Sequence, residues 1–259
     1  MAQIYDDVIR FNGINLFQRY GLMSVHVKQS EERIFGIKRS MEFQDRVGNP
    51  IFIKNKDERV TFQVELCKVV RDEPTSITER ELDEIGRILF KEGISCMESQ
   101  GVLYYGAFIE SNSWFNSARQ GYLNLTFEMA TPYPYSRVYI DTINVDGIKE
   151  IEIYNKSSVK GNLYIDMEFK QLGESGSLIE VKNKTNGNEM IFRNIDKNEV
   201  IQVDGEDILE VRSKTNKDKN IFNDLNYNSF IKIRYGRNII QIKGKCKMNI
   251  KYQLPLIMK

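Results

Sequence analysis

Residues 123–129 read LNLTFEM, with apolar and polar side chains in strict alternation. Side chains on a β-strand point alternately to the two faces of a sheet, so this pattern predicts a strand with one buried face. The same alternation recurs at 60–66, 163–169, 231–235, 240–242 and 248–252. Tight turns are predicted at Asp146-Gly147, Asn186-Gly187 and Asp204-Gly205, because glycine tolerates the positive φ of hairpin turns. The chain is therefore predicted to be mostly antiparallel β.

One α-helix is predicted over about residues 79–91. The Thr78 side chain can accept a hydrogen bond from the amide of Glu81, whose carboxylate can in turn accept one from the amide of Thr78. An apolar stripe at helical spacing follows at Leu82, Ile85 and Leu89. We expect this stripe to pack onto an N-terminal sheet.

A domain boundary is predicted near the segment TPYPY, residues 131–135. Its prolines cannot donate backbone hydrogen bonds and favour extended backbone, which is typical of a stiff connector. The charge balance also changes here. Residues 1–134 carry 16 basic and 19 acidic side chains (net −3) and residues 135–259 carry 21 and 17 (net +4), which together give the +1 of the whole chain. We predict two domains, residues 1–133 and 134–259.

Two polar stretches lie between the alternating segments. Residues 44–59 are extended and charged and contain Gly48 and Pro50, which suits a projecting hairpin. Residues 213–228 are predicted as a long surface loop.

The composition argues against several classes of protein. With 37 basic and 36 acidic residues, the chain has no global charge that would attract nucleic acid or an anionic membrane. No window approaches 18 apolar residues, and the N-terminus has acids where a signal peptide carries basic residues. Cys67, Cys96 and Cys246 form no CxxC pair. Neither a disulfide framework nor a zinc site is therefore predicted, and we expect folding in a reducing host cytoplasm.

The sequence presents no constellation that suits catalysis. His26 is the only histidine, and its place in an alternating segment favours an outward strand residue over a general base or metal ligand. Acidic neighbours such as Asp6-Asp7 and Glu206-Asp207 would point to opposite faces of a strand, unlike the facing carboxylates of a glycosidase. We therefore predict a protein that is not an enzyme and needs no cofactor or metal.

Several short motifs follow one another in an informative order. They are Phe11-Asn12-Gly13, the capped helix, Tyr104-Tyr105-Gly106, residues 121–128 (GYLNLTFE) and Pro132-Tyr133-Pro134-Tyr135. This ordered set resembles the distal tail protein (Dit) family of siphophages and related prophages. Residues 235–242 (YGRNIIQI) are similar to the family's Pro-Gly-Asn-X-Ile strand, but Tyr235 stands in place of Pro and Arg237 is inserted. The resemblance spans nearly the whole chain, although no single motif is specific.

The resemblance implies a fold and a place in an assembly. Family members have an N-terminal β-sandwich with one α-helix and a projecting hairpin, and a C-terminal galectin-like β-sandwich. Six copies form a ring at the phage tail tip, and the ring leaves a central channel for DNA. The implied partners are the tail tube protein, the tail-associated baseplate hub or tail-tip protein and, in some phages, receptor-binding proteins. The implied location is the virion, at the tail tip or baseplate.

We expect the N-terminal domain to form such a ring. Exposed sheet edges are liabilities unless they are covered, and a projecting hairpin from a neighbouring subunit can cover one. A head-to-tail contact whose rotation closes produces a ring. The candidate interface residues are Arg39, Met41, Phe43, Arg46, Ile51 and Ile53.

Two alternatives stay open on the sequence alone. A carbohydrate-binding module would recognise host cell-wall sugar through its second domain. Residues 135–259 contain neither Trp nor His, so Tyr139, Tyr154 and Tyr227 would have to supply the stacking surface. In the first half, the aromatic run at 102–109 favours core packing over a sugar platform. A hydrolase would need paired acids in a cleft, which the sequence does not indicate.

Overall fold

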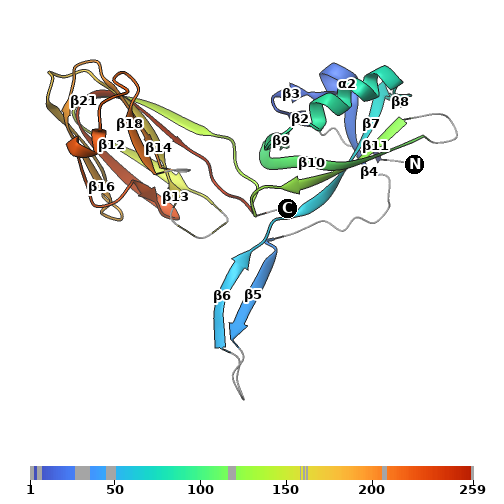
Figure 1. The fold of residues 1–259 in the computed structure, drawn as a ribbon, viewed down its shortest axis with the longest axis horizontal. Helices are drawn as coiled ribbons and strands as arrows, with labels where there is room; N and C mark the ends of the chain where they lie inside the picture. Colours follow the sequence, from blue (N-terminus) through green and yellow to red (C-terminus); the bar gives the residue numbers. More distant parts are fainter. Residues whose placement is uncertain are drawn as a thin grey trace. The chain divides into compact units, whose positions relative to one another are not determined.

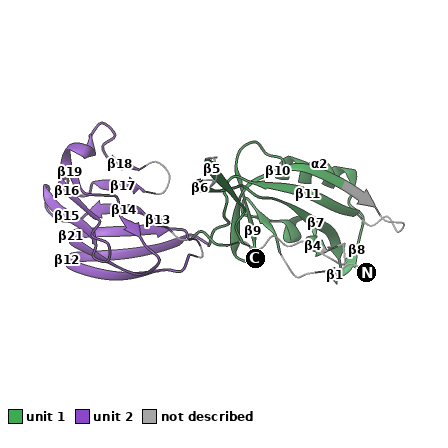
Figure 2. Cartoon of the chain, turned by 90° about the horizontal axis from the view of Figure 1, so that it is seen from below, with its two compact units in different colours: residues 1–136, 255–259 green, residues 137–254 purple. Residues whose placement is uncertain are grey.

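The structure is a computed structural model, and it describes residues 3–4, 8–26, 36–44, 51–115, 121–157, 159, 161, 163–205 and 209–257. The chain divides into two compact units (Figure 2). Unit 1 comprises residues 1–136 and 255–259, and unit 2 comprises residues 137–254. The sequence placed the boundary three residues earlier, at 133/134, and assigned 255–259 to the second domain.

The end of the chain joins unit 1 through backbone hydrogen bonds. Tyr135 exchanges two of them with Leu103 (2.7 and 2.8 Å), and the amide of Leu256 donates to the carbonyl of Pro134 (2.8 Å). Tyr135 also forms a β-bridge with Pro255. The Pro-Tyr-Pro connector is therefore fixed to unit 1, since the carbonyl of Pro134 and the backbone of Tyr135 have partners there.

Unit 1 is built on one continuous nine-stranded antiparallel sheet (Figure 1). The strand order is β1-β4-β7-β11-β10-β9-β2-β3, and β8 pairs with β7. The strands are β1 (Gln3–Ile4), β2 (Arg10–Phe11), β3 (Ile14–Asn15), β4 (Leu22–His26), β7 (Thr61–Val70), β8 (Glu73–Pro74), β9 (Ser95–Ser99), β10 (Val102–Phe115) and β11 (Gly121–Met129). The predicted alternation holds on β11, where Leu123, Leu125, Phe127 and Met129 are all buried.

The predicted helix packs against this sheet as α2 (Glu79–Leu89). The Thr78 amide donates to the Glu81 carboxylate (2.8 Å), and the Glu81 amide donates to the Thr78 hydroxyl (3.3 Å). Ile85 and Leu89 are buried in the core of unit 1, whereas Leu82 is only partly buried against it. A second helix, α1 (Leu16–Tyr20), was not predicted because it is a single turn with too few residues for a helical stripe.

Unit 2 contains an eight-stranded sheet of order β18-β17-β14-β21-β15-β16-β19, with β12 also paired to β21. Its strands are β12 (Tyr139–Asn155), β14 (Asp166–Gln171), β15 (Ser177–Asn183), β16 (Glu189–Ile195), β17 (Val200–Asp204), β18 (Glu210–Ser213), β19 (Leu225–Tyr227) and β21 (Gly236–Tyr252). Strands β13 (Leu163–Tyr164) and β20 (Lys232–Ile233) form a separate pair. The segment 213–228, predicted as a loop, contains η1 (Ile221–Asp224) and β19.

This sheet folds over on itself into a sandwich. The first half of β21 pairs with β15 and its second half pairs with β14, while β12 follows β21 over its full length. The tight turn predicted at Asp146-Gly147 is wrong, because both residues lie within β12. Gly147 and Gly244 lie opposite each other in the middle of that pair, both at positive φ. A Cβ on Gly244 would lie 2.7 Å from the carbonyl oxygen of Leu178, so only glycine fits this close approach.

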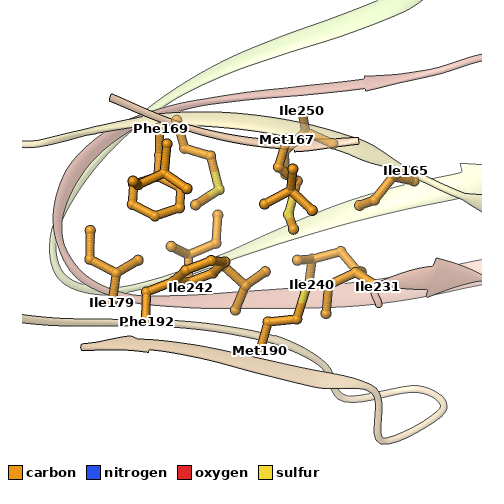
Figure 3. Close-up of a cluster of buried hydrophobic side chains, with 14 of the residues drawn as sticks. Ile165, Met167, Phe169, Ile179, Met190, Phe192, Ile231, Ile240, Ile242 and Ile250 are labelled. Atoms are coloured by element: carbon orange, nitrogen blue, oxygen red, sulfur yellow. The ribbon is translucent and has the colours of Figure 1, made fainter. Parts of the chain in front are cut away.

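The two halves of the folded sheet meet in an apolar core (Figure 3). Phe169 from β14 and Phe192 from β16 are fully buried, with their ring centres 4.9 Å apart in an edge-to-face contact. The predicted fold class is confirmed: the chain is mostly β, with a helix-bearing first unit, a projecting hairpin and a second unit that is a β-sandwich of the expected galectin-like kind.

Candidate assembly interface

The hairpin β5 (Arg39–Gln44) and β6 (Ile51–Asp57) forms a two-stranded sheet of its own. It extends away from the nine-stranded sheet of unit 1 (Figure 1). The base of the hairpin is fixed by Asp57, which accepts hydrogen bonds from Arg39 Nε (2.5 Å) and from the hydroxyl of Tyr133. The base of the hairpin is therefore attached to the Pro-Tyr-Pro segment of unit 1 through Tyr133.

Apolar side chains gather on this hairpin without a core to cover them. The exposed fractions are 64% for Met41, 49% for Phe43, 51% for Phe52 and 50% for Ile53. Phe43 and Phe52 are cross-strand partners, and their rings meet edge to face with centres 5.9 Å apart. We call these four residues the apolar hairpin surface.

A β-bulge shapes the apolar hairpin surface. Glu42 pairs with Lys54 but Phe43 pairs with Phe52, so Ile53 is an extra residue on β6. Such a residue breaks the strict alternation of the strand and redirects its neighbours. The other face is polar, with an ion pair of 3.1 Å between Lys54 and Glu42. Met41, Phe43 and Phe52 thus share one face of the hairpin, with the Arg39–Asp57 pair at its base, and the Glu42–Lys54 pair lies on the other face.

The predicted interface residues take different places in this geometry. Met41, Phe43 and Ile53 belong to the apolar hairpin surface. The guanidinium of Arg39 is engaged by Asp57 within the hairpin. The backbone of Ile51 begins β6, but its side chain and the whole of Arg46 lie outside the described residues. Sequence reasoning missed Phe52, because the bulge that brings Phe52 opposite Phe43 leaves no signal in the alternation.

The three tyrosines proposed for sugar stacking do not come together. Tyr139 and Tyr154 lie at opposite ends of β12, and Tyr139 is stacked on Tyr252. Tyr227 lies on β19, which is separated from β12 by β16, β15 and β21. A single aromatic platform is therefore not formed by these residues. In unit 1, Phe108 of the run 102–109 is buried in the core, and Tyr104 packs on Phe62.

The cysteines are poorly suited to thiolate chemistry. Burial raises the pKa of the Cys67 thiol to about 11 against a hydrogen bond with Tyr122, and burial alone raises the pKa of Cys246 to about 11. Burial and the charge of Glu98 also raise the pKa of Cys96. The nucleophile and metal ligand is the thiolate, so all three residues stay in the unreactive form near neutral pH.

The described part of the chain contains neither a cluster of metal-ligating side chains nor a membrane-spanning helix. Within residues 3–257, apart from the stretches that the structure does not describe, no three His, Cys, Asp or Glu side chains cluster as a metal site would require. No helix of these described residues is long and apolar enough to cross a bilayer. His26 lies on β4, and its side chain is outside the described set.

The comparisons with known proteins point to phage tails. Residues 133–252 match the family model described as "Phage tail C-terminal domain". No curated protein matches the chain significantly.

Solved phage structures share the fold over almost the whole chain. The Dit protein of phage SPP1, described as a paradigm of the hub adsorption apparatus in phages that infect Gram-positive bacteria, superposes with a TM-score of 0.65 at 9% identity. The match covers 96% of this chain and 100% of that protein. A chain of the phage P2 baseplate in its activated conformation with calcium gives a TM-score of 0.52 at 11% identity, covering 95% and 98% of the two chains.

The strontium form of the same baseplate gives a TM-score of 0.53 at 11% identity, covering 96% and 98%. The predicted resemblance to Dit is thereby confirmed at the level of the fold. The matched structures are a phage hub protein and chains of a phage baseplate, and this chain shares their fold.

Proposed function

We propose that this chain is a distal tail protein that forms a ring, six copies in all, at the tip of a phage tail. The ring joins the tail tube protein to the baseplate hub or tail-tip protein, and its second unit offers a place for receptor-binding proteins. The observation that carries the proposal is the apolar hairpin surface, which extends from unit 1 and finds no cover among the described residues.

An isolated two-stranded hairpin is marginally stable in water, so a hairpin with an exposed apolar face needs a partner surface. Burying the exposed half of each large side chain contributes about 1 kcal/mol, and the contact repeats at every subunit of a ring. The nine-stranded sheet ends at β1 and β3, which offer edges that a neighbouring hairpin can cover.

The face of the unit 1 sheet opposite its core suits a channel for DNA. Alternate residues of β7, β10 and β11 point to this face, among them Glu65, Glu110 and Glu128. Thr61, Gln63, Asn112, Asn124 and Thr126 point to the same face, and these strands place no lysine or arginine there. Further along β7 and β11 the face becomes apolar, where Cys67, Val69 and Tyr122 are buried with Met23 and Val25. The polar and acidic part of this face gives phosphates no ion-pair partner, so DNA would pass it without binding.

The proposed role requires no catalysis and no cofactor. The three thiols are held protonated, and the relatives with this fold are structural components. The virion tail tip or baseplate is the place where such a protein acts, after synthesis in the host cell.

The test is a pair of matched double variants in assembled particles. Phe43→Ser with Phe52→Ser removes the apolar hairpin surface, whereas Glu42→Gln with Lys54→Gln changes only the charged face and leaves the net charge unaltered. We expect the first pair to abolish incorporation of the chain into tails and the second to leave it normal, as measured by mass spectrometry and image reconstruction of purified particles. A normal ring on the tail axis with the Phe43→Ser, Phe52→Ser chain would contradict the proposal.

A further inference from the structure

Three asparagines are fully buried at one end of the unit 2 sandwich. Asn155, Asn183 and Asn238 each have no exposed surface. A buried amide costs free energy unless its hydrogen bonds are made, so each of these side chains must have a structural or functional task.

The task of these amides is to fix the loop that follows β20. Asn238 donates to the carbonyls of Arg234 (2.7 Å) and Gly236 (3.0 Å), and its oxygen accepts from the amide of Arg234 (3.0 Å). Asn183 donates to the carbonyl of Lys232 (2.6 Å). Beneath the loop, Ile231 and Ile233 are buried in the core. The backbone of residues 231–238 is therefore held at almost every step.

This fixed loop presents its side chains to solvent. Tyr235 is 65% exposed, and Arg234 and Arg237 are exposed on either side of it. Tyr154, 52% exposed, lies directly opposite Arg237 in the β12–β21 pair, so their side chains share a face. The ammonium of Lys156 lies 5.8 Å from the centre of the Tyr154 ring. We call these five residues the tyrosine–arginine surface.

The charge of the tyrosine–arginine surface is only partly balanced. Arg237 forms an ion pair of 2.8 Å with Glu152. Arg234 and Lys156 take part in no ion pair with the described residues. The tyrosine–arginine surface thus carries two exposed aromatic rings and three cationic side chains, of which only Arg237 is paired with an acid among the described residues.

We propose that the tyrosine–arginine surface docks a protein partner of the tail through acidic side chains. Tyrosine and arginine are the residues that dominate binding energy at protein interfaces. Both tyrosines are more than half exposed and so stand out from the surface, whereas sites for small ligands are concave. A loop already ordered by buried amides loses little conformational freedom on binding, which favours affinity. The uncompensated cations select a partner with Asp and Glu at the contact.

The inference rests on the proposed function only in that the partner is sought in the tail. A photoreactive phenylalanine analogue in place of Tyr235 is introduced into the full chain within phage particles, and the same analogue in place of the exposed Tyr227 serves as the control. We expect crosslinks from position 235, and not from 227, to a polypeptide segment in which Asp and Glu outnumber Lys and Arg. Adding Arg234→Gln and Arg237→Gln should lower the crosslink yield at least fivefold. Lys245→Gln, which removes an exposed lysine paired with Asp146, should leave the yield unchanged.

Each outcome decides between the two proposals. Particles that contain the chain but give no crosslink at 235, or crosslinks only to glycan, nucleic acid or a segment without excess acid, overturn this inference and leave the proposed function standing. Particles that lack the chain altogether contradict both.

Discussion

The β5–β6 hairpin and the β12–β21 pair are both antiparallel ribbons that carry large apolar side chains. On β21, Ile240, Ile242, Met248 and Ile250 have no exposed surface, because the ribbon bends at its glycines and encloses its own apolar side. On the hairpin, Met41 and Phe43 stay about half exposed or more. Apolar alternation therefore indicates that a face will be covered, but the cover can come from the same chain or from another molecule.

The largest expected change in stability comes from a substitution in the core of unit 2. Phe192→Ala removes a fully buried ring that contacts Phe169, and we expect a loss of about 3–5 kcal/mol in the free energy of unfolding. Urea unfolding followed by circular dichroism measures this loss. A cost below about 1 kcal/mol would mean that the sandwich core is not tightly packed, and the contrast with the hairpin would disappear.

Helix α2 allows a buried and a partly buried leucine to be compared within one element. Leu89→Ala should destabilise by about 2–5 kcal/mol, because its side chain is buried against the sheet. Leu82→Ala should cost roughly half as much, since Leu82 is only partly buried. Thermal melts of the two variants provide the measurement. Equal melting temperatures for both would show that burial on α2 does not follow the structure.

A smaller, pH-dependent effect is expected at Glu199. Burial opposes ionisation of this carboxyl, but hydrogen bonds from Lys219, the Asp196 amide and Ser213 outweigh it and hold its pKa below the ordinary value. A carboxyl whose pKa is lower when folded contributes stability above its unfolded pKa, and this contribution is lost as the pH falls through the folded pKa.

Glu199→Gln should therefore cost about 1–3 kcal/mol at pH 7 and progressively less as the solution is acidified below pH 4. Unfolding curves of the wild type and the variant from pH 7 to pH 3 test this. Glu168→Gln, which removes an exposed carboxylate paired with Lys214, is the control and should show a far smaller pH dependence. A difference in the free energy of unfolding between Glu199→Gln and the wild type that is the same at every pH would argue against the ion pair with Lys219.

The smallest change in stability is expected on the hairpin. Phe52→Ala on the hairpin should change the free energy of unfolding of the unassembled chain by less than about 0.5 kcal/mol, because its ring is half exposed and leaves no cavity. The same urea titration used for Phe192→Ala gives the value. A cost similar to that of Phe192→Ala would show that the hairpin is covered within its own chain.

The sequence predicted the elements whose signals are local. The capping residues Thr78 and Glu81 and the stripe ending at Leu89 defined α2, and strict alternation defined β11 and much of β21. Its motif order also pointed to the Dit fold, which the likeness to the SPP1 Dit structure confirmed.

The features that escaped prediction depend on pairing between distant residues. Nothing in the alternation of residues 51–57 marks the bulge at Ile53, because a bulge is a property of two strands in register. The opposition of Gly147 and Gly244 is equally non-local. The asparagines at 155, 183 and 238 are unremarkable as separate polar residues, and only their meeting at one end of the sandwich reveals how they hold the loop at 231–238.

The return of residues 255–259 to unit 1 makes unit 2 a cassette inserted into unit 1 rather than a tail appended to it. Its entry and exit are neighbours, since Tyr139 pairs with Tyr252 and Tyr135 bridges to Pro255. A domain whose two ends are adjacent can be replaced by another without changing the fold of the domain that carries it, because only the two connections have to match. Unit 2 can therefore change in evolution while the packing of unit 1 stays the same.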